Sequence, residues 1–321
     1  MRSKDAHQNS KSMSEQIKVS VCMIAYNQED FIAEAIESIL RQKTSFPVEI
    51  VIGDDNSKDK TGEICAAYAA ENPGRVKYHR REPNLGMMPN FIKTLGECDG
   101  QYIAVCEGDD FWTDEHKLQL QVDFMEAHAE VSLCCHDHSV FANGEMLRPN
   151  EDIAEDLKIL ETKDYMRNPF FHTSSYFFRR DAQPAPYPDW YRNVLAGDHF
   201  LVLFLSMQGK IGYLNRRMSV FRNHGSSVSF TRKALEIKQN FVRHLEIFND
   251  YSDRRFEDEI NEVINRWNLI YQVYEPVGYL KKISYLVQNS GFYLQNFQKV
   301  GGLKLLVKYL VPNSLLQQLK N

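Results

Sequence analysis

The chain has 321 residues, of which 43% are hydrophobic, 12% aromatic and 25% charged. These proportions are typical of folded globular proteins and exclude the disordered and fibrous classes. The formal net charge is −5 and the sequence pI is about 6.1. A general nucleic-acid binder needs an overall basic field to neutralise phosphates, so we expect no nucleic-acid partner.

Cysteine usage and the N-terminus indicate the compartment. No two of the six cysteines form a C-x-x-C pair, and several lie within apolar runs. We therefore expect small buried residues in a reducing compartment, without disulfides or a zinc site. The segment 1–16 is polar, is predicted to be flexible and lacks the apolar run of a secretion signal, and no stretch approaches the length of a membrane span. These features predict a cytoplasmic protein, at most peripheral on the inner face of a membrane.

The first 140 residues alternate short apolar runs with amphipathic stretches. This pattern is typical of parallel strands that crossover helices bury on both faces. It predicts an α/β fold with a mostly parallel sheet flanked by helices. The predicted strands span residues 18–25, 48–53, 76–80, 102–106 and 131–135.

Polar residues follow three of these strands. The first strand ends in Ala25-Tyr26-Asn27, the second in Asp54-Asp55-Asn56-Ser57 and the fourth in Glu107-Gly108-Asp109-Asp110. Open parallel sheets bind ligands at the carboxyl ends of their strands, so we expect the three segments to converge on one edge.

Carboxylates and a nucleotide diphosphate are both negatively charged and repel each other. Such an edge can therefore bind a nucleotide diphosphate only if a cation lies between the carboxylates and the phosphates. Mg²⁺ or Mn²⁺ does this with one or two carboxylates, phosphate oxygens and water, and Asp109 with Asp110 supplies that arrangement. The alternative is a turn or a helix cap, and Asp54 to Ser57 could also cap a helix. A cap needs one such residue. Two consecutive carboxylates are better explained if one of them accepts a hydrogen bond from a base N–H.

The four motifs resemble those of the inverting family 2 glycosyltransferases with the GT-A fold. They are Val19 to Asn27, Ile50 to Ser57, Asn84-Leu85-Gly86 and Glu107 to Asp110. The resemblance covers about 120 residues closely and reaches Phe230 more loosely. Each motif alone is weak, but four in this order and spacing are specific.

The resemblance implies a role for each matching residue. Ala25, Tyr26 and Asn27 would line the nucleotide pocket with Asp54, and Asp55 would accept from the pyrimidine N–H. Asp109 would contact the ribose, and Asp110 would hold Mn²⁺ or Mg²⁺ on the diphosphate. The family motif is commonly written D-x-D, whereas this chain presents its acids as Glu107-Gly108-Asp109-Asp110.

Two later motifs complete the implied site. Gly197-Asp198-His199 resembles the position of the catalytic base, which an inverting transfer needs because the acceptor hydroxyl loses its proton as it attacks. Asp198 could instead cap the predicted helix 197–208, and the two roles can coexist. The segment 222–229 resembles a late loop in which a histidine, here His224, completes the metal shell or contacts phosphate. The alternative is a surface histidine in a loop.

Two other groups of residues resemble functional sites. Cys134-Cys135-His136-Asp137-His138 looks like a metal cluster, but strand alternation would point its members to opposite faces, which favours a structural or acceptor-side role. His172 begins a predicted strand, residues 172–178, and either lies near the acceptor or is hydrogen-bonded inside.

We expect a GT-A domain over residues 17–230, with nucleotide-sugar binding in 17–140 and the acceptor side in 141–230. Residues 231–321 should be helical. After Glu275 the chain has six lysines and no acidic residue, and an amphipathic helix is predicted to end near Pro312. This basic tail either docks on an anionic membrane or packs on protein.

The sequence thus predicts transfer of a sugar from a nucleotide-diphosphate sugar, with UDP favoured, to a glycan or lipid-linked glycan during polysaccharide synthesis. One alternative is a nucleotidyltransferase, although the first strand lacks the glycine-rich basic loop of that class. Another is an idle nucleotide-sugar-binding scaffold. The dinucleotide and P-loop glycine motifs are both missing from the sequence. The sugar and the acceptor are not predicted, because irregular loops shape those pockets.

Overall fold

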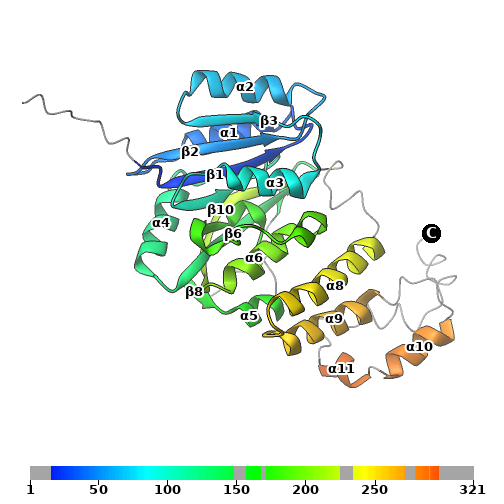
Figure 1. Cartoon of the computed structure of the whole chain (residues 1–321). Helices are drawn as coiled ribbons and strands as arrows, with labels where there is room; N and C mark the ends of the chain where they lie inside the picture. Colours follow the sequence, from blue (N-terminus) through cyan, green and yellow to red (C-terminus); the bar gives the residue numbers. More distant parts are fainter. Residues whose placement is uncertain are drawn as a thin grey trace, which may run out of the picture. The chain divides into compact units, whose positions relative to one another are not determined.

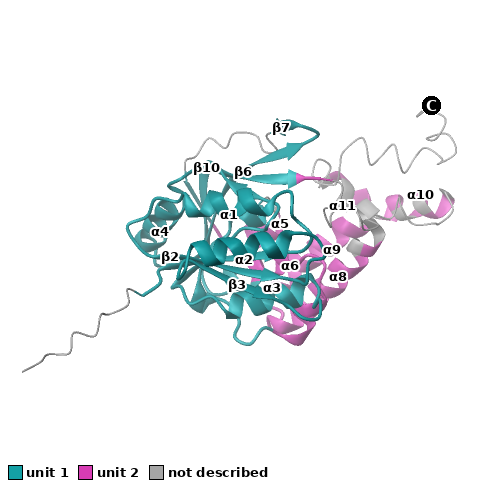
Figure 2. Cartoon of the chain, turned by 90° about the horizontal axis from the view of Figure 1, so that it is seen from above, with its two compact units in different colours: residues 1–159, 171–187, 204–222 teal, residues 160–170, 188–203, 223–321 magenta. Residues whose placement is uncertain are grey.

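A computed structural model describes residues 16–147, 157–167, 171–224, 234–271, 279–288 and 290–295. The chain forms two compact units (Figure 2). Unit 1 contains residues 1–159, 171–187 and 204–222, and unit 2 contains residues 160–170, 188–203 and 223–321. The predicted tail helix lies outside the described residues, as does all but the last residue of the predicted flexible segment 1–16.

A ten-stranded sheet forms the centre of unit 1, with the order β3-β2-β1-β4-β9-β6-β10-β5. Strands β3, β2, β1 and β4 are mutually parallel, whereas β9 pairs antiparallel to β4 and β6. Strand β7 pairs with β6 and β8 with β10. The strands are β1 Val19–Ala25, β2 Val48–Asp54, β3 Val76–Arg80, β4 Tyr102–Val105, β5 Phe111–Trp112, β6 Val131–Ala142, β7 Glu145–Leu147, β8 Leu157–Leu160, β9 Phe177–Arg179 and β10 Lys210–Asn223.

The helices of the first 130 residues flank this sheet (Figure 1). They are α1 Ile32–Leu40, α2 Thr61–Glu71, α3 Met87–Gly96 and α4 Lys117–Ala127. Helix α3 packs on β1 and β2, α4 packs on β6, and α1 contacts α2 and β5. The strands are apolar on both faces because helices cover both, and Val19, Val21, Met23, Ile50 and Ile52 are buried in the resulting core. The predicted α/β fold is confirmed.

Four predicted strands match within one residue at each end, but two predictions need correction. Strand β6 continues to Ala142 instead of ending at residue 135. The predicted strand 172–178 is wrong in its first half, where Thr173–Ser175 forms a 3-10 turn. The imidazole of His172 accepts from the Ser174 N–H, and the Ser175 hydroxyl donates to the His172 carbonyl oxygen. These local hydrogen bonds compete with strand pairing.

Unit 2 is mainly helical. Its helices are α5 Thr162–Arg167, the first part of α6 Gly197–Ser206, α8 Ala234–Tyr251, α9 Glu257–Tyr271, α10 Tyr279–Gln288 and α11 Ser290–Gln295. Helix α9 contacts both α5 and α8, and the Arg266 guanidinium donates to the Arg167 carbonyl oxygen. Aromatic rings of Trp190, Phe241 and Phe248 surround Phe200. Within the described ranges, no helix is both long and apolar enough to cross a bilayer.

All six cysteines are buried and none is in a disulfide. Burial raises the pKa of the Cys65 and Cys134 thiols to about 12. The thiols are therefore protonated at neutral pH and serve as small core residues, as the sequence predicts.

Candidate functional site

The three polar segments lie at one edge of the sheet, because β2, β1 and β4 are parallel neighbours. Ala25 pairs with Asp54 and Cys22 with Val105, so the strands end side by side. The Asp55 N–H donates to the Ala25 carbonyl oxygen at 2.9 Å, and the Gly108 N–H donates to that of Ile24 at 3.1 Å. The loops after the strands are therefore held together by backbone hydrogen bonds.

Asn27 fixes the loop after β1. It has a left-handed backbone with φ of 53°, which asparagine tolerates better than most residues. Its N–H donates to the Ser57 hydroxyl oxygen at 3.0 Å, and its side-chain oxygen accepts from the Lys58 N–H at 2.8 Å. Tyr26 beside it stays 48% exposed, whereas Ala25 is buried. The loop thus presents an aromatic ring to solvent from a rigid backbone.

Asp54 is buried and fastens the end of β2 to its surroundings. Its Oδ1 accepts from both the N–H and the hydroxyl of Ser57, and its Oδ2 accepts from the Tyr78 hydroxyl at 2.9 Å. Burial and this hydrogen bond to a carboxylate raise the pKa of Tyr78 to about 12. Asp54 therefore has a structural role, and its hydrogen bonds to Ser57 are of the local kind that the sequence offered as an alternative, whereas the bond from Tyr78 on β3 was not predicted.

Asp55 orders the loop before α3. Its two carboxylate oxygens accept from the N–H groups of Leu85 and Gly86 at 2.7 and 2.8 Å, and the Asn84 amide donates to its carbonyl oxygen. Gly86 has a φ of +89°, which favours glycine. The Asn84-Leu85-Gly86 motif and Asp55 are thus one hydrogen-bonded unit. Each carboxylate oxygen keeps a second lone pair for another donor.

Asp110 is buried, and only one of its carboxylate oxygens is satisfied. Oδ1 accepts from the Arg222 N–H at 3.0 Å, whereas Oδ2 has no hydrogen-bond partner among the described residues. Burial, followed by repulsion from Asp109 and Glu107, raises the pKa of Asp110 well above its ordinary value. The Arg222 guanidinium donates to the Asp109 carbonyl oxygen and pairs with Glu34. Repulsion from neighbouring acids therefore acts on the Asp110 carboxyl in this loop.

His172 borders Asp110. Its Nδ1 lies 3.6 Å from Asp110 Oδ2, and its ring packs between His138 and Phe221, with centroid distances of 5.1 and 4.3 Å. Burial lowers the pKa of His172 to about 3, so the imidazole is neutral at physiological pH. Across the described ranges, no group of three or more His, Cys, Asp or Glu side chains has the geometry of a metal site.

Asp198 lies in the first turn of α6 within unit 2. Its side chain is exposed, and the protein atoms around it raise the pKa of the carboxyl by partial desolvation. The Tyr191 hydroxyl donates to the Gly197 carbonyl oxygen at 2.7 Å, and the buried His199 ring hydrogen-bonds to the Tyr165 hydroxyl. Asp198 thus projects from a firmly held helix start. His224 also belongs to unit 2 and is half-buried.

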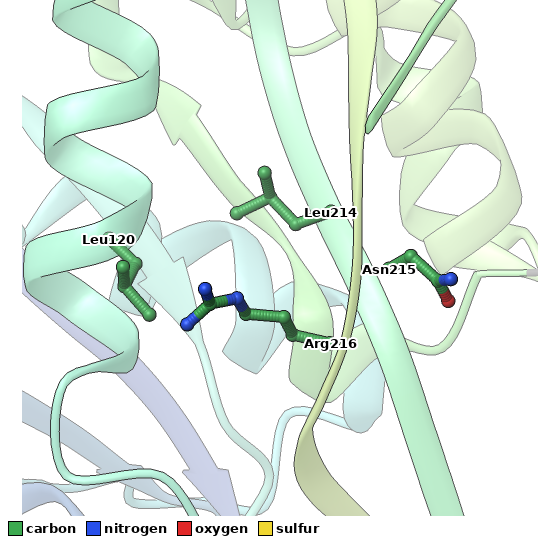
Figure 3. A pocket seen from close by; sticks show the side chains of 4 residues that line it. All are labelled: Leu120, Leu214, Asn215 and Arg216. Atoms are coloured by element: carbon green, nitrogen blue, oxygen red, sulfur yellow. The ribbon is translucent and has the colours of Figure 1, made fainter. Parts of the chain in front are cut away.

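A shallow pocket in unit 1 does not coincide with these residues. Leu120 of α4 and Leu214, Asn215 and Arg216 of β10 line it (Figure 3). Figure 3 shows the Arg216 guanidinium directed toward Leu120, with Asn215 on the other side of the strand. No residue that the sequence singled out lines this pocket, so the strand-end loops remain the candidate site.

Comparison with known proteins matches the region that contains the loops after β1, β2 and β4, whereas Asp198 and His224 lie beyond the match to the family model. The model of the family "Glycosyl transferase family 2" matches residues 20–183. The uncharacterized protein Rv1520 of Mycobacterium tuberculosis is 35% identical over 218 residues, which are 65% of this chain and 60% of Rv1520. The minor teichoic acid biosynthesis protein GgaB of Bacillus subtilis is 26% identical over 229 residues, or 70% of this chain and 25% of GgaB.

Solved structures share the fold. Residues 1–349 of S. aureus TarS in complex with UDP-GlcNAc align with a TM-score of 0.63 at 15% identity, covering 88% of this chain and 80% of that one. The mannosyltransferase PcManGT of Pyrobaculum calidifontis, in complex with GDP-Man and Mn²⁺, aligns with a TM-score of 0.55 at 15% identity, covering 94% of this chain and 88% of that one.

Proposed function

Since the chain belongs to glycosyl transferase family 2 and has the GT-A fold, we propose that it is a glycosyltransferase that moves a sugar from a nucleotide-diphosphate sugar to an acceptor hydroxyl with inversion. The observation that carries the proposal is the buried Oδ2 of Asp110, which has no hydrogen-bond partner among the residues that the structure describes. It lies in the loop after β4, at the sheet edge that also presents the exposed Tyr26. Residues of this kind at the carboxyl ends of parallel strands suit a nucleotide diphosphate that binds together with a divalent cation.

The loops after β1 and β2 would bind the nucleotide. Tyr26, exposed on its fixed loop, offers a ring against which a base can stack, with Ala25 and Asn27 beside it. Asp55 has acceptor capacity left for a pyrimidine N–H, while Asp54 holds the loop in place. We favour UDP because TarS is complexed with UDP-GlcNAc, although PcManGT is complexed with GDP-Man.

The residues present fit a divalent cation. An ion at Asp110 would neutralise a carboxylate whose pKa burial and neighbouring acids raise, and it would contact Oδ2, for which the described part of the chain supplies no hydrogen-bond donor. Mn²⁺ or Mg²⁺ needs only one or two protein carboxylates when phosphate oxygens and water fill the remaining positions. Bound there, the ion would stabilise the departing nucleotide diphosphate. Asp109 would contact the ribose, and His224 is a second proposed ligand.

Asp198 would act as the catalytic base. Because its pKa is raised, its carboxylate is a stronger base than an ordinary aspartate, which suits removal of a proton from an acceptor hydroxyl. Asp198 lies in the first turn of α6, and Phe200 of the same helix packs against the Trp190 ring, so the position of Asp198 is well fixed.

The test is Asp198→Asn. We expect turnover, measured as release of nucleoside diphosphate with acceptor present, to fall at least about 100-fold. Donor binding should stay within about twofold, measured by titration with the nucleotide sugar that most stabilises the protein thermally in the presence of Mn²⁺. Asp189→Asn, at a fully exposed aspartate of the same unit, is the matched control. Loss of donor binding would assign Asp198 to the nucleotide pocket, and unchanged turnover would remove it from the chemistry.

We further propose a glycan or lipid-linked glycan acceptor in polysaccharide synthesis, reached at the surface of an anionic membrane. GgaB, named for teichoic acid biosynthesis, supports the pathway. Helix α10 supports the membrane contact. Leu280 and Val287, seven residues apart and therefore on one face, are 81% and 65% exposed, and Lys281 is exposed beside them. Apolar residues flanked by lysine favour a bilayer with anionic headgroups.

A further inference from the structure

We propose that Arg222 is a positioning residue for Asp110, and that it acts through its guanidinium. Contacts to α1 and to the acidic loop, Glu107 to Asp110, hold this guanidinium, and it thereby keeps the Arg222 N–H against the Asp110 carboxylate. The inference rests on the proposed metal at Asp110. It gives a role to Arg222 and to Glu34, neither of which the sequence indicated as a site residue.

Arg222 holds two consecutive residues of the acidic loop. Its N–H donates to Asp110 Oδ1 at 3.0 Å, and its guanidinium donates to the Asp109 carbonyl oxygen at 2.8 Å. Because the backbone of Asp109 and one carboxylate oxygen of Asp110 are both held, the carboxylate cannot rotate without breaking a hydrogen bond. Arg222 therefore sets the direction of Oδ2, the oxygen proposed to bind the cation.

The guanidinium is itself held in place from α1 and β5. It pairs with Glu34 in the first turn of α1. Its central carbon lies 4.3 Å from the centre of the Phe111 ring on β5 and 5.3 Å from that of Phe31, which precedes α1. A planar guanidinium can stack on rings while its N–H groups donate to two acceptors, which a lysine ammonium cannot do. The side chain of Arg222 thus joins three segments of unit 1.

Strand pairing with β5 does not reach Arg222. On that side of β10 the register ends where Val220 pairs with Phe111, two residues before Arg222. Beyond this pair, the described hydrogen bonds from Arg222 to the acidic loop come from its own N–H and guanidinium. We therefore expect the end of β10 to move away from Asp110 when the guanidinium contacts are lost.

Calorimetric titration of the full chain with UDP, or with GDP if UDP does not bind, tests the inference. The measured quantity is the ratio of the nucleotide affinity with Mn²⁺ to that without metal, because the proposed ion contacts the nucleotide and Asp110 together. Arg222→Met keeps the contact with the rings but removes the guanidinium hydrogen bonds. We expect it to lower the ratio at least about 10-fold, or to one, and to leave the metal-free affinity within about twofold. Arg216→Met, at an exposed arginine of the same strand, should change neither quantity.

Glu34→Ala tests the same contact from α1 and leaves β10 unchanged. Its side chain is 53% exposed, so the variant should fold. We expect it to lower the ratio about two- to fivefold, as for the loss of a partly exposed ion pair. Glu37→Ala, at an exposed glutamate of the same helix, is the matched control and should leave the ratio unchanged.

The outcomes distinguish the inference from the proposed function. If Mn²⁺ does not raise nucleotide affinity in the wild type, or if Asp110→Asn leaves the ratio unchanged, the proposed metal at Asp110 fails and the inference fails with it. If Asp110→Asn lowers the ratio but folded Arg222→Met does not, the metal stands and Arg222 does not position its ligand. Circular dichroism verifies folding. If Arg222→Met does not fold, an unchanged ratio in Glu34→Ala overturns the inference.

Two further results would assign Arg222 a different role. Loss of metal-free affinity in Arg222→Met would show that the guanidinium acts on the nucleotide itself. His224, the other proposed ligand, lies two residues from Arg222. If Arg222→Met has no effect in a His224→Gln background, Arg222 acts through His224 and the assignment to Asp110 is wrong. We expect the same fold-change in both backgrounds, because independent effects add.

Discussion

Lys117 is a fully buried cation without a carboxylate partner in the hydrogen bonds and ion pairs that the structure describes. Its Nζ donates to Gln121 Oε1 at 2.8 Å and lies 3.9 Å from the centre of the Trp112 ring. Burial lowers the pKa of Lys117 to about 7. The charged form is therefore disfavoured in the folded protein, although it is fully present in the unfolded chain at neutral pH.

This difference predicts a pH-dependent stability. Between pH 7 and about 10.5 the unfolded chain binds more protons at Lys117 than the folded protein, so this residue makes stability rise with pH across that window, by at most about 1.4 kcal/mol per pH unit. We expect Lys117→Met to remove this contribution. The measurement is chemical unfolding of wild type and variant from pH 6.5 to 9. Parallel curves would show that Lys117 keeps its ordinary pKa.

Asp54 and Asp55 show how far residue chemistry could be predicted. The sequence indicates acids at the carboxyl end of a strand, because strand and turn signals are local. Their partners are Tyr78 on β3 for Asp54 and the backbone of Leu85 and Gly86 for Asp55. Such hydrogen bonds join segments that only the folded sheet brings together. The sequence therefore predicted where the two acids lie, but not the hydrogen bonds through which they hold the loops in place.

At the scale of elements, the loops after β1 and β4 touch closely at Gly108. A Cβ added there would lie 2.4 Å from Gln28 Oε1 and 2.6 Å from Ile32 Cδ1. We expect Gly108→Ala to force the Gln28 and Ile32 side chains away from the acidic loop and, because Ile32 is fully buried, to destabilise the protein by about 1–3 kcal/mol. Donor affinity, measured by calorimetric titration, should fall at least about 10-fold, since the proposed site uses both loops.

Gly96 provides the matched control. It ends α3, and an added Cβ meets nothing within 4 Å. Gly96→Ala should leave donor affinity unchanged and the free energy of unfolding equal or up to about 1 kcal/mol higher, because alanine favours a helix. If both variants bind donor like the wild type, the spacing of the two loops does not control the site.

The same scale explains which elements the sequence predicted. Strands β1 to β4 are short apolar runs buried on both faces, and this pattern is visible locally. Strand β10 has no such pattern, because its 14 residues include Asn215, Arg216 and Arg217 among apolar ones, and it was not predicted. It pairs with β5 through Ser219 and Val220, and Arg222 near its end holds Asp110. The antiparallel part of the sheet is therefore where sequence patterns were least informative.

For the whole molecule, charge is distributed unevenly along the chain. The net charge is −5, yet residues 276–321 contain six lysines and no acid. Helix α10 lies in this segment, with Leu286 buried and with Leu280 and Val287 exposed. An acidic protein with a basic, apolar end would approach an anionic bilayer through that end, since the lysines are attracted within about one Debye length and the aliphatic side chains then insert.

We therefore expect the full chain to float with vesicles of phosphatidylcholine and phosphatidylglycerol at low salt, and much less with pure phosphatidylcholine. Replacing Leu280 and Val287 together by Gln should weaken binding at least about 10-fold, because two inserted aliphatic side chains contribute a few kcal/mol. Met146→Gln, at a residue of β7 that is 53% exposed in the other unit, should bind like the wild type.

Deleting residues 300–321 distinguishes a membrane contact through α10 from one through the tail. If only the deletion weakens binding, the tail is the membrane contact, and if neither change does, the chain meets its acceptor without this surface.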